Sequence, residues 1–347
     1  MNVAQKTAGP APARTLASVG SLSSRGWEKL GDAWITGVLV VLLVAFSIAS
    51  PDFLTKAAWV ATALAATEVI LVGVGMAYVL IARGIDLSIG ANLGLSAMLS
   101  ALVMSKLIGT DGTGSTGVIL IGLAISLVAG TLVGVLNGLV ITRMRINPLI
   151  ATLGTSGAAT GITQLLNGGQ QISQIPSGMI DLGTSTWFGG WLPVPALIAI
   201  VVVVVLGFIL RSTRFGQRTY AIGSNPEAAL RTGISVNRHT VGIYALAGGC
   251  AGLAGFLVMA QLGAASVTAG QSDTLPAIAA AVIGGVSLFG GRGSVFGAVV
   301  GALIITILQT GLVIAKVEAS WQVIAVGVVL VLAVFVDQQR IRLATRR

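Results

Sequence analysis

The sequence predicts an all-α polytopic membrane protein with about ten transmembrane helices. Of its 347 residues, 55% are hydrophobic and only 9% are charged, whereas about a quarter of the residues of a soluble globular domain are charged. The mean hydropathy is +0.95. The 47 glycines fit this class, because glycine lets membrane helices approach one another closely. These observations place the chain outside the range of soluble globular proteins.

Apolar stretches recur along the chain and define the candidate spans. A membrane-spanning helix needs about 20 mostly apolar residues. The stretch at 148–166 is the weakest, since its Thr and Ser hydroxyls must bond to helix backbone or to neighbouring helices. The ten stretches lie at residues 34–50, 57–82, 85–108, 117–141, 148–166, 191–210, 239–262, 274–290, 294–315 and 320–337.

Both ends of the chain are predicted to be cytosolic tails. Residues 1–33 are rich in Ala, Ser, Thr and Gly and lack an apolar run, which predicts a disordered tail. A cleaved signal peptide would carry its hydrophobic region much earlier, so we expect the first span to be retained. Residues 338–347 form a basic tail, and residues 34–337 are the predicted transmembrane domain.

The distribution of basic residues sets the expected orientation. With the N-terminus inside and ten crossings, 17 of the 20 Lys and Arg residues lie in cytosolic segments, and only Lys56, Lys106 and Lys316 lie outside. This asymmetry follows the positive-inside rule and supports an even number of spans. It also explains the net charge of +9, so nucleic-acid binding is a poor interpretation. The largest cytosolic loop is residues 211–238.

A short capped helix is predicted within this loop. Asn225 can cap its first amides, and Pro226 suits the first helical position. Glu227 faces the positive helix end and Arg231 the negative end, while Gly233 can adopt the left-handed stop. The helix is either a rigid handle for a partner protein or an ordinary solvated loop helix.

Five spans on each side of the same loop raise the question of an inverted repeat. A half with an odd number of spans is flipped when it is repeated. Breaks that contain Gly and Ser follow the second and the seventh span, at residues 84–94 and 263–273. The chain is therefore compatible with a five-plus-five inverted repeat.

No residue pattern indicates catalysis. His239 is the single histidine. Cys250 is the single cysteine, and it lies in an apolar run. A Ser-His-Asp triad, a disulfide framework and a metal site therefore lack the necessary residues. None of the five lysines follows a glycine, as a phosphate-binding P-loop requires. We expect no enzyme activity and no cofactor in this chain, with ATP and Mg²⁺ bound by a separate ATPase.

Polar residues inside the spans are candidates for a substrate pathway. Glu68 lies near the middle of its span, where an ionised acid costs about 2.5–3.5 kcal/mol. It either faces a wet pathway or is protonated and bonded to a neighbouring helix. Neutral amides can bind hydroxyl-bearing substrates, although each is also suited to bonding between helices. The amide candidates are Asn92, Asn137, Gln164, Asn167 and Gln309.

Four segments of the chain carry a family resemblance: GMAYVLIARGIDLSIGANLGLSAML at 75–99, LVGVLNGLVITRMRINPLIATLGT at 132–155, EAALRTG at 227–233 and GGVSLFGGRGSVFGAVVGAL at 284–303. These segments resemble the membrane permeases of ribose-type sugar ATP-binding-cassette importers. They occur in the order expected for the family and span most of the chain after the tail.

Three departures from the family pattern stand out. Arg83 occupies a position where the family usually has a second glycine, and Leu149 follows Pro148 where the family has Phe. Glu68 also replaces an expected less acidic residue, so the substrate need not be ribose itself.

The resemblance implies a permease subunit that moves a monosaccharide or related polyol across the bacterial inner membrane. It implies a second permease subunit, two cytosolic ATPase subunits and an extracytoplasmic substrate-binding protein. Permeases for nucleosides or branched-chain amino acids, and a stand-alone secondary transporter, remain alternatives. The residues implied in ATPase coupling are Asn225, Pro226, Glu227, Ala228, Ala229, Arg231 and Gly233, and those implied in gating are Arg83, Gly84, Asp86 and Ser88.

Overall fold

A computed structural model describes residues 21–108 and 115–345 of the chain, and most of these residues are helical. Two short strands of two residues each pair to form an antiparallel hairpin. The elements are α1 (Ser21–Ala49), η1 (Pro51–Leu54), α2 (Lys56–Ile81), α3 (Ile89–Leu107), α4 (Thr116–Arg143), α5 (Pro148–Leu166), α6 (Ser177–Thr184), β1 (Thr186–Trp187), β2 (Leu192–Pro193), α7 (Val194–Ser212), α8 (Arg214–Ser224), α9 (Pro226–Arg231), α10 (Val236–Leu262), α11 (Thr274–Ile283), α12 (Val295–Ile314) and α13 (Ala319–Thr345).

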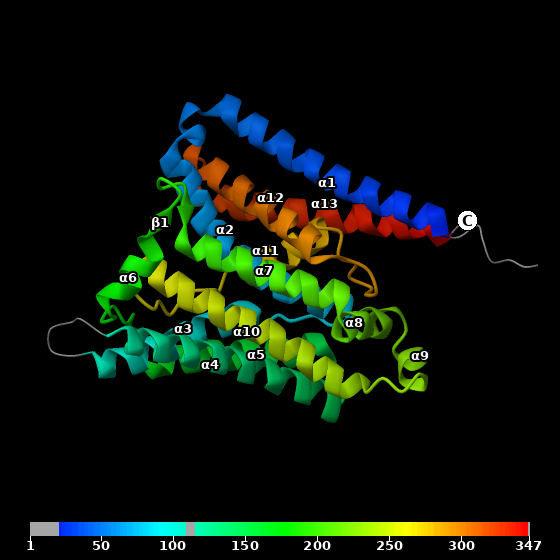
Figure 1. Ribbon diagram of the computed structural model, residues 1–347, viewed down its shortest axis with the longest axis horizontal. Coiled ribbons are helices and arrows are strands. Elements are labelled where there is room, and N and C mark those ends of the chain that lie inside the picture. The colour runs from blue at the N-terminus through cyan, green and yellow to red at the C-terminus, as the bar shows by residue number, and fades with distance from the viewer. Residues whose placement is uncertain (1–20, 109–114, 346–347) are drawn as a thin grey trace, which may run out of the picture.

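The long helices form one elongated bundle with two distinct ends (Figure 1). Helices α8 and α9 lie at the end of the bundle at which α13 also ends, and we call this the α9 end. Helix α6 and the β1–β2 hairpin lie at the opposite end, which we call the hairpin end. The helices thus run between two ends that carry different short elements.

Helices α2 and α10 form the centre of the bundle. Helix α10 packs against α2, α3 and α4, and α2 also packs against α11 and α12. The α4–α10 contact is close because glycines face it: a Cβ on Gly130 or Gly134 would overlap backbone atoms of α10. Such backbone contact is the usual means by which helices associate in lipid, where no hydrophobic force drives them together.

Six described helices are long and apolar enough to cross a membrane, namely α2, α3, α4, α7, α10 and α12. Residues 35–49, 274–283 and 319–335 form shorter apolar helices. The chain is therefore an all-α, multi-pass membrane protein, as predicted. Helix α5 has the predicted bounds of 148–166 but is less hydrophobic than these helices.

Three predicted boundaries differ from the structure. The stretch at 274–290 is helical only to Ile283, because Gly284 and Gly285, the latter with φ +83°, end the helix. Helix α1 already begins at Ser21, inside the predicted tail of residues 1–33, whose residues 1–20 lie outside the described range. Helix α13 continues to Thr345 through most of the predicted tail of residues 338–347.

Two helices begin well inside the bundle. Helix α3 starts at Ile89 after a non-helical segment of residues 82–88 from the α9 end, and Ser88 and Ile89 are fully buried. Helix α11 starts at Thr274 after residues 263–273, which enter from the hairpin end. The two starts meet, because a Cβ on Gly90 would overlap the carbonyl of Gly270 and approach the hydroxyl of Thr274.

Candidate functional site

Helix α9 has the capped structure that its sequence predicts. The Asn225 side chain accepts a hydrogen bond from the amide of Ala228 at 3.0 Å, and Pro226 is the first helical residue. At the other end Gly233 has φ +83°, and its amide donates to the carbonyl of Leu230 at 3.0 Å. Both ends of this six-residue helix are therefore fixed by local bonds.

The side chains of α9 divide into an inner and an outer set. Ala229 is only 4% exposed and anchors the helix to the protein. Glu227, Ala228 and Arg231 are exposed. Leu230, which the sequence analysis did not select, is 63% exposed. An exposed leucine flanked by an acid and a base gives α9 the mixed chemistry of a protein interface.

A second short helix, α8, connects α9 to the bundle. The Thr219 hydroxyl lies 2.9 Å from Nε2 of His239 on α10. The rings of Phe215 and His239 also pack together, with centroids 4.4 Å apart. The single described histidine thus joins α8 to the first turns of α10.

The end of α8 meets two other segments, and we call this contact the junction. It consists of residues 81–83 after α2, 223–224 at the end of α8 and 290–293 before α12. The Gly291 amide donates to the Ile81 carbonyl at 2.8 Å, and the Tyr220 hydroxyl donates to the Gly293 carbonyl at 2.7 Å. A Cβ on Gly223 would overlap the Ile81 carbonyl. The junction therefore connects the segment that carries α9 to α2 and α12.

The predicted gating residues lie beside the junction. Arg83 is exposed and has φ +64°, a left-handed conformation that favours glycine. This conformation explains why a glycine suits the position. Gly84 is closely packed, since a Cβ there would lie 2.7 Å from the Tyr244 hydroxyl.

Asp86 and Ser88 form a buried polar network with α4. The Ser88 amide and hydroxyl donate to Oδ1 of Asp86 at 2.9 and 2.6 Å, and Nδ2 of Asn137 donates to the Ser88 hydroxyl at 2.7 Å. Oδ1 of Asn137 is buried without a partner in the described structure. Asn137, predicted as a pathway residue, thus bonds one of the residues predicted to act in gating.

The same segment is bound from two further helices. The Leu87 amide donates to the Thr152 hydroxyl of α5 at 3.0 Å, and the Tyr244 hydroxyl of α10 donates to the Ile85 carbonyl at 3.0 Å. Residues 84–88 are therefore held by α4, α5 and α10 together.

The other predicted pathway residues are dispersed. Asn92 is buried, and its Nδ2 donates to the Gly130 carbonyl at 3.0 Å, which joins α3 to α4. Asn167 ends α5 and bonds the carbonyl of Gln170 at 3.2 Å. Gln164 is exposed on α5, and Gln309 is half-buried on α12. The structure does not gather these amides into one site.

Glu68 has an acidic neighbour that the sequence analysis missed. It is half-buried on α2, and its carboxyl interacts electrostatically with that of Asp273, which precedes α11. Asp273 lies in the break at residues 263–273, but nothing in the linear pattern places it beside α2.

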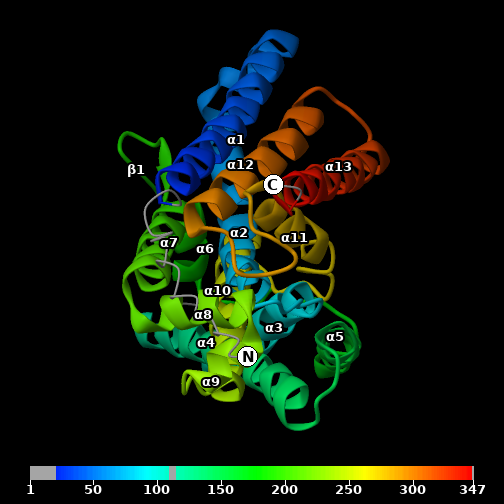
Figure 2. The ribbon, with the colours of Figure 1, turned by 90° about the vertical axis from the view of Figure 1, so that its right-hand side faces the viewer.

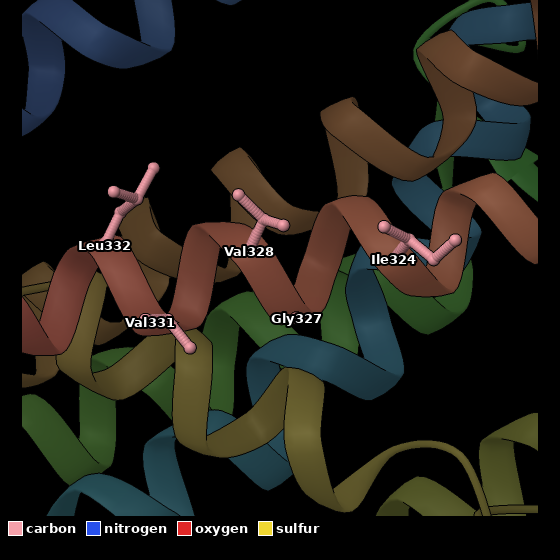
Figure 3. A pocket seen from close by; sticks show the side chains of 5 residues that line it. All are labelled: Ile324, Gly327, Val328, Val331 and Leu332. Carbon is pink, nitrogen blue, oxygen red and sulfur yellow. The ribbon is translucent and has the colours of Figure 1, made fainter.

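The protein surface has two depressions of note. One, of about 600 Å³, lies at the α9 end between the α4–α5 connection and the start of α10, and includes Arg145, Asn147 and Asn237. The other, of about 410 Å³, lies on α13, with Ile324, Val328 and Leu332 along one side (Figure 3). Its lining is almost entirely apolar, which suits contact with lipid rather than with a polar substrate.

Comparison with known proteins identifies the class of this bundle. A family model described as "Branched-chain amino acid transport system / permease component" matches residues 58–334. The ribose import permease protein RbsC of Bacillus subtilis is 38% identical over 87% of this chain and 91% of its own length. The D-allose transport system permease protein AlsC of Escherichia coli is 33% identical over 90% and 92%, respectively. The fructose import permease protein FrcC of Rhizobium meliloti is 31% identical over 87% and 83%.

No solved structure matches the chain significantly. The relatives confirm the resemblance to ribose-type permeases that the four sequence segments indicate. Because the family model covers most of the chain, the chain belongs to the family of branched-chain amino acid transport system permease components.

Proposed function

We propose that this chain is the permease subunit of an ATP-binding-cassette importer for a monosaccharide or a related polyol. The observation that carries this proposal is the match to sugar import permeases over about 90% of both chains. A soluble binding protein delivers the sugar, and separate ATPase subunits bind ATP and Mg²⁺. The chain itself performs no covalent chemistry.

The test is uptake of radiolabelled ribose, allose, fructose and arabinose into proteoliposomes. Uptake should require the permease, the ATPase, the binding protein and internal ATP together. Uptake by the permease alone, driven by an ion gradient, would show a secondary transporter and overturn the proposal. Competition by leucine would reassign the substrate to the branched-chain amino acids that the family description names. Competition by a nucleoside would reassign it to nucleosides.

Coupling to the ATPase is assigned to α9. Its capped ends, the anchor at Ala229 and the exposed Glu227, Leu230 and Arg231 support this role. The junction supports a route from α9 through α8 to α2 and α12, because these elements share backbone contacts there.

The proposed topology has ten crossings of the bacterial inner membrane, with both termini in the cytosol. Each predicted span contains a helix, although α11 has only 10 residues. Arg143 and Arg211, which lie in the last turns of α4 and α7, support a cytosolic α9 end through the positive-inside rule.

The helix contacts support a five-plus-five inverted repeat. If α2, α3, α4 and α5 correspond to α10, α11, α12 and α13, each major contact has a counterpart. Helix α2 packs on α12 as α10 packs on α4, and α2 packs on α11 as α10 packs on α3. The α3–α4 and α3–α5 contacts likewise correspond to α11–α12 and α11–α13. The breaks before α3 and α11 occupy equivalent places.

The outer face of α5 supports pairing with a second permease subunit. Gly154, Gly157 and Gly161 have open space where a Cβ would lie, and Gln164 is exposed. Helix α5 packs only against α3 and α4 to any extent in the described structure. A small and partly polar face suits contact with another helix better than contact with lipid. A twofold pair would bring the two α5 faces together.

A further inference from the structure

Exposed aromatic side chains gather at the hairpin end, and neither substrate transport nor ATPase coupling uses them. Residues 185–193, which we call the aromatic hairpin, carry Trp187, Phe188 and Trp191 with exposed fractions of 58%, 73% and 49%. Trp59 in the first turn of α2 is 52% exposed. Large aromatic side chains at this exposure indicate a surface that meets something other than bulk water.

The aromatic hairpin is firmly built. Thr186 pairs with Pro193 and Trp187 with Leu192, and the Trp191 amide donates to the Trp187 carbonyl at 3.2 Å. Phe188 at its tip has φ +52° and is followed by two glycines with positive φ. The direction of these side chains is therefore set by the backbone.

Two bonds hold the hairpin to the start of α2. Nζ of Lys56 donates to the Gly189 carbonyl at 2.7 Å, and Nε1 of Trp59 donates to the Trp191 carbonyl at 3.0 Å. The depth of the hairpin relative to the membrane is thus fixed by α2.

The length of α2 gives that depth. Its 26 residues span about 39 Å, because an α-helix rises about 1.5 Å per residue. If α2 is upright and centred on a hydrocarbon core about 30 Å thick, about 4–5 Å of helix extends beyond the core at each end. Trp59 lies about 4.5 Å from the start of α2, at the boundary between hydrocarbon and headgroups.

The hairpin is continuous with a surface that faces lipid. Strand β2 leads directly into α7, a candidate membrane span. Ile200, Val204 and Phe208 on α7 are exposed. No charged residue occurs from 182 to 210, so Lys56 is the cation that the hairpin holds, and the hairpin and α7 add none of the charges that usually orient a soluble protein partner. Figure 2 shows the hairpin and α5 on opposite sides of the bundle, so the hairpin is remote from the proposed pairing face.

We propose that the aromatic hairpin is a lipid anchor that seats the hairpin end in the headgroup layer of the membrane. The indole rings occupy the boundary, where an amphipathic ring contacts both hydrocarbon and polar groups. The Lys56 ammonium has three donors and gives one to Gly189, so it can also bind a lipid phosphate. The anchor is independent of the identity of the transported substrate.

The test uses spin labels on full-length protein reconstituted in vesicles of phosphatidylethanolamine and phosphatidylglycerol. Cys250 is buried and is the only cysteine, so it is replaced by Ala, and Phe188→Cys is labelled. The matched control is Gln170→Cys, an exposed position that follows α5 at the hairpin end. Trp187→Cys is a second test position in case Phe188→Cys disturbs the turn.

At position 188 or 187, membrane-soluble oxygen should relax the label more than a water-soluble nickel chelate does. At position 170 the order should reverse. Labels at 187 and 188 that respond to the nickel chelate as strongly as the label at 170 would overturn the proposal. Protection of these labels only after addition of the purified binding protein would also overturn it and assign the hairpin to protein docking.

Discussion

The amide of Gly291 donates a 2.8 Å hydrogen bond to the carbonyl of Ile81, which joins the loop before α12 to the last turn of α2. The two residues are far apart in sequence, and Gly223 of α8 lies against both. This contact places the end of α8, just before α9, where it can displace a helix from each half of the proposed repeat.

Substitution of Gly223 by Ala should uncouple transport. The new Cβ would overlap backbone atoms of Ile81 and Gly291, neither of which can move as a side chain does. Sugar uptake should fall while the ATPase still co-purifies, since α9 itself is unchanged. Gly207→Ala on α7 is the control, because its Cβ would lie 3.8 Å from Val295 in ordinary contact. Uptake by Gly223→Ala at the level of this control would contradict a role of the junction in coupling.

Substitution of Leu230 by Ala should weaken binding of the ATPase subunit. If Leu230 is one of the few residues that carry the binding energy, its truncation should cost about 1 kcal/mol or more, which is roughly a fivefold loss of affinity. Glu227→Lys should also lower transport and ATPase stimulation, although it costs α9 only about 0.3–1 kcal/mol. Membrane insertion should not change in either variant. The comparison is Val204→Ala on the exposed face of α7, and equal ATPase affinity for the Leu230 and Val204 variants would exclude Leu230 from the interface.

Replacement of Arg83 should reveal the strain of its backbone. Arg83→Gly and Arg83→Ala both remove the side chain, but only glycine relieves the left-handed φ of +64°. The glycine variant should be more stable than the alanine variant by about 1 kcal/mol. The difference should be measured as a higher midpoint of thermal unfolding in detergent. An alanine variant as stable as the glycine variant would show that the conformation at this position is not strained.

Disulfide cross-linking tests the pairing face on α5. In protein with Cys250 replaced, Gly157→Cys should form a covalent dimer on oxidation in membranes, because position 157 has open space around it. Val204→Cys on α7, which is 64% exposed, should remain monomeric. Dimers from Val204→Cys together with monomers from Gly157→Cys would move the interface to α7.

Variants of Glu68 distinguish a pathway residue from a bond between helices. Glu68→Gln keeps the hydrogen-bonding shape, and Glu68→Leu removes it. If Glu68 contacts the sugar, loss of a bond to a charged group should cost about 1.5–3 kcal/mol, so Glu68→Leu should raise the KM for uptake tenfold or more and Glu68→Gln much less. An unchanged KM in both variants, at normal expression, would leave only the structural role.

The regular helices were predictable because hydrophobicity alone specifies them. The bounds of 148–166 agree with α5, and the caps at Asn225 and Gly233 agree with α9, since capping depends on local chemistry. The structure also has α8 in the same loop, which the sequence analysis did not anticipate. The cap of α8 at Thr213 depends on local chemistry. The contact of α8 with His239 is a tertiary contact, which the sequence pattern does not reveal.

Contacts between distant segments were not predictable from one sequence. Leu230 was passed over because its exposure depends on which side of α9 Ala229 anchors. The proximity of Asp273 to Glu68 depends on how far residues 263–273 enter the bundle. The pathway role expected of Asn92 and Asn137 stays a prediction, and only the fold shows that their side chains bond other segments.

The shortness of α11 has a consequence for biogenesis. Its 10 residues span about 15 Å, half the hydrocarbon thickness, so the segment cannot partition into lipid on its own as a complete helix. Gly297 and Gly301 of α12 contact Gly284 and Ala280 through their backbones, which lets the two helices enter the bilayer as a hairpin. Insertion of α11 therefore waits for synthesis of α12, and a chain truncated before residue 295 would leave α11 outside the membrane.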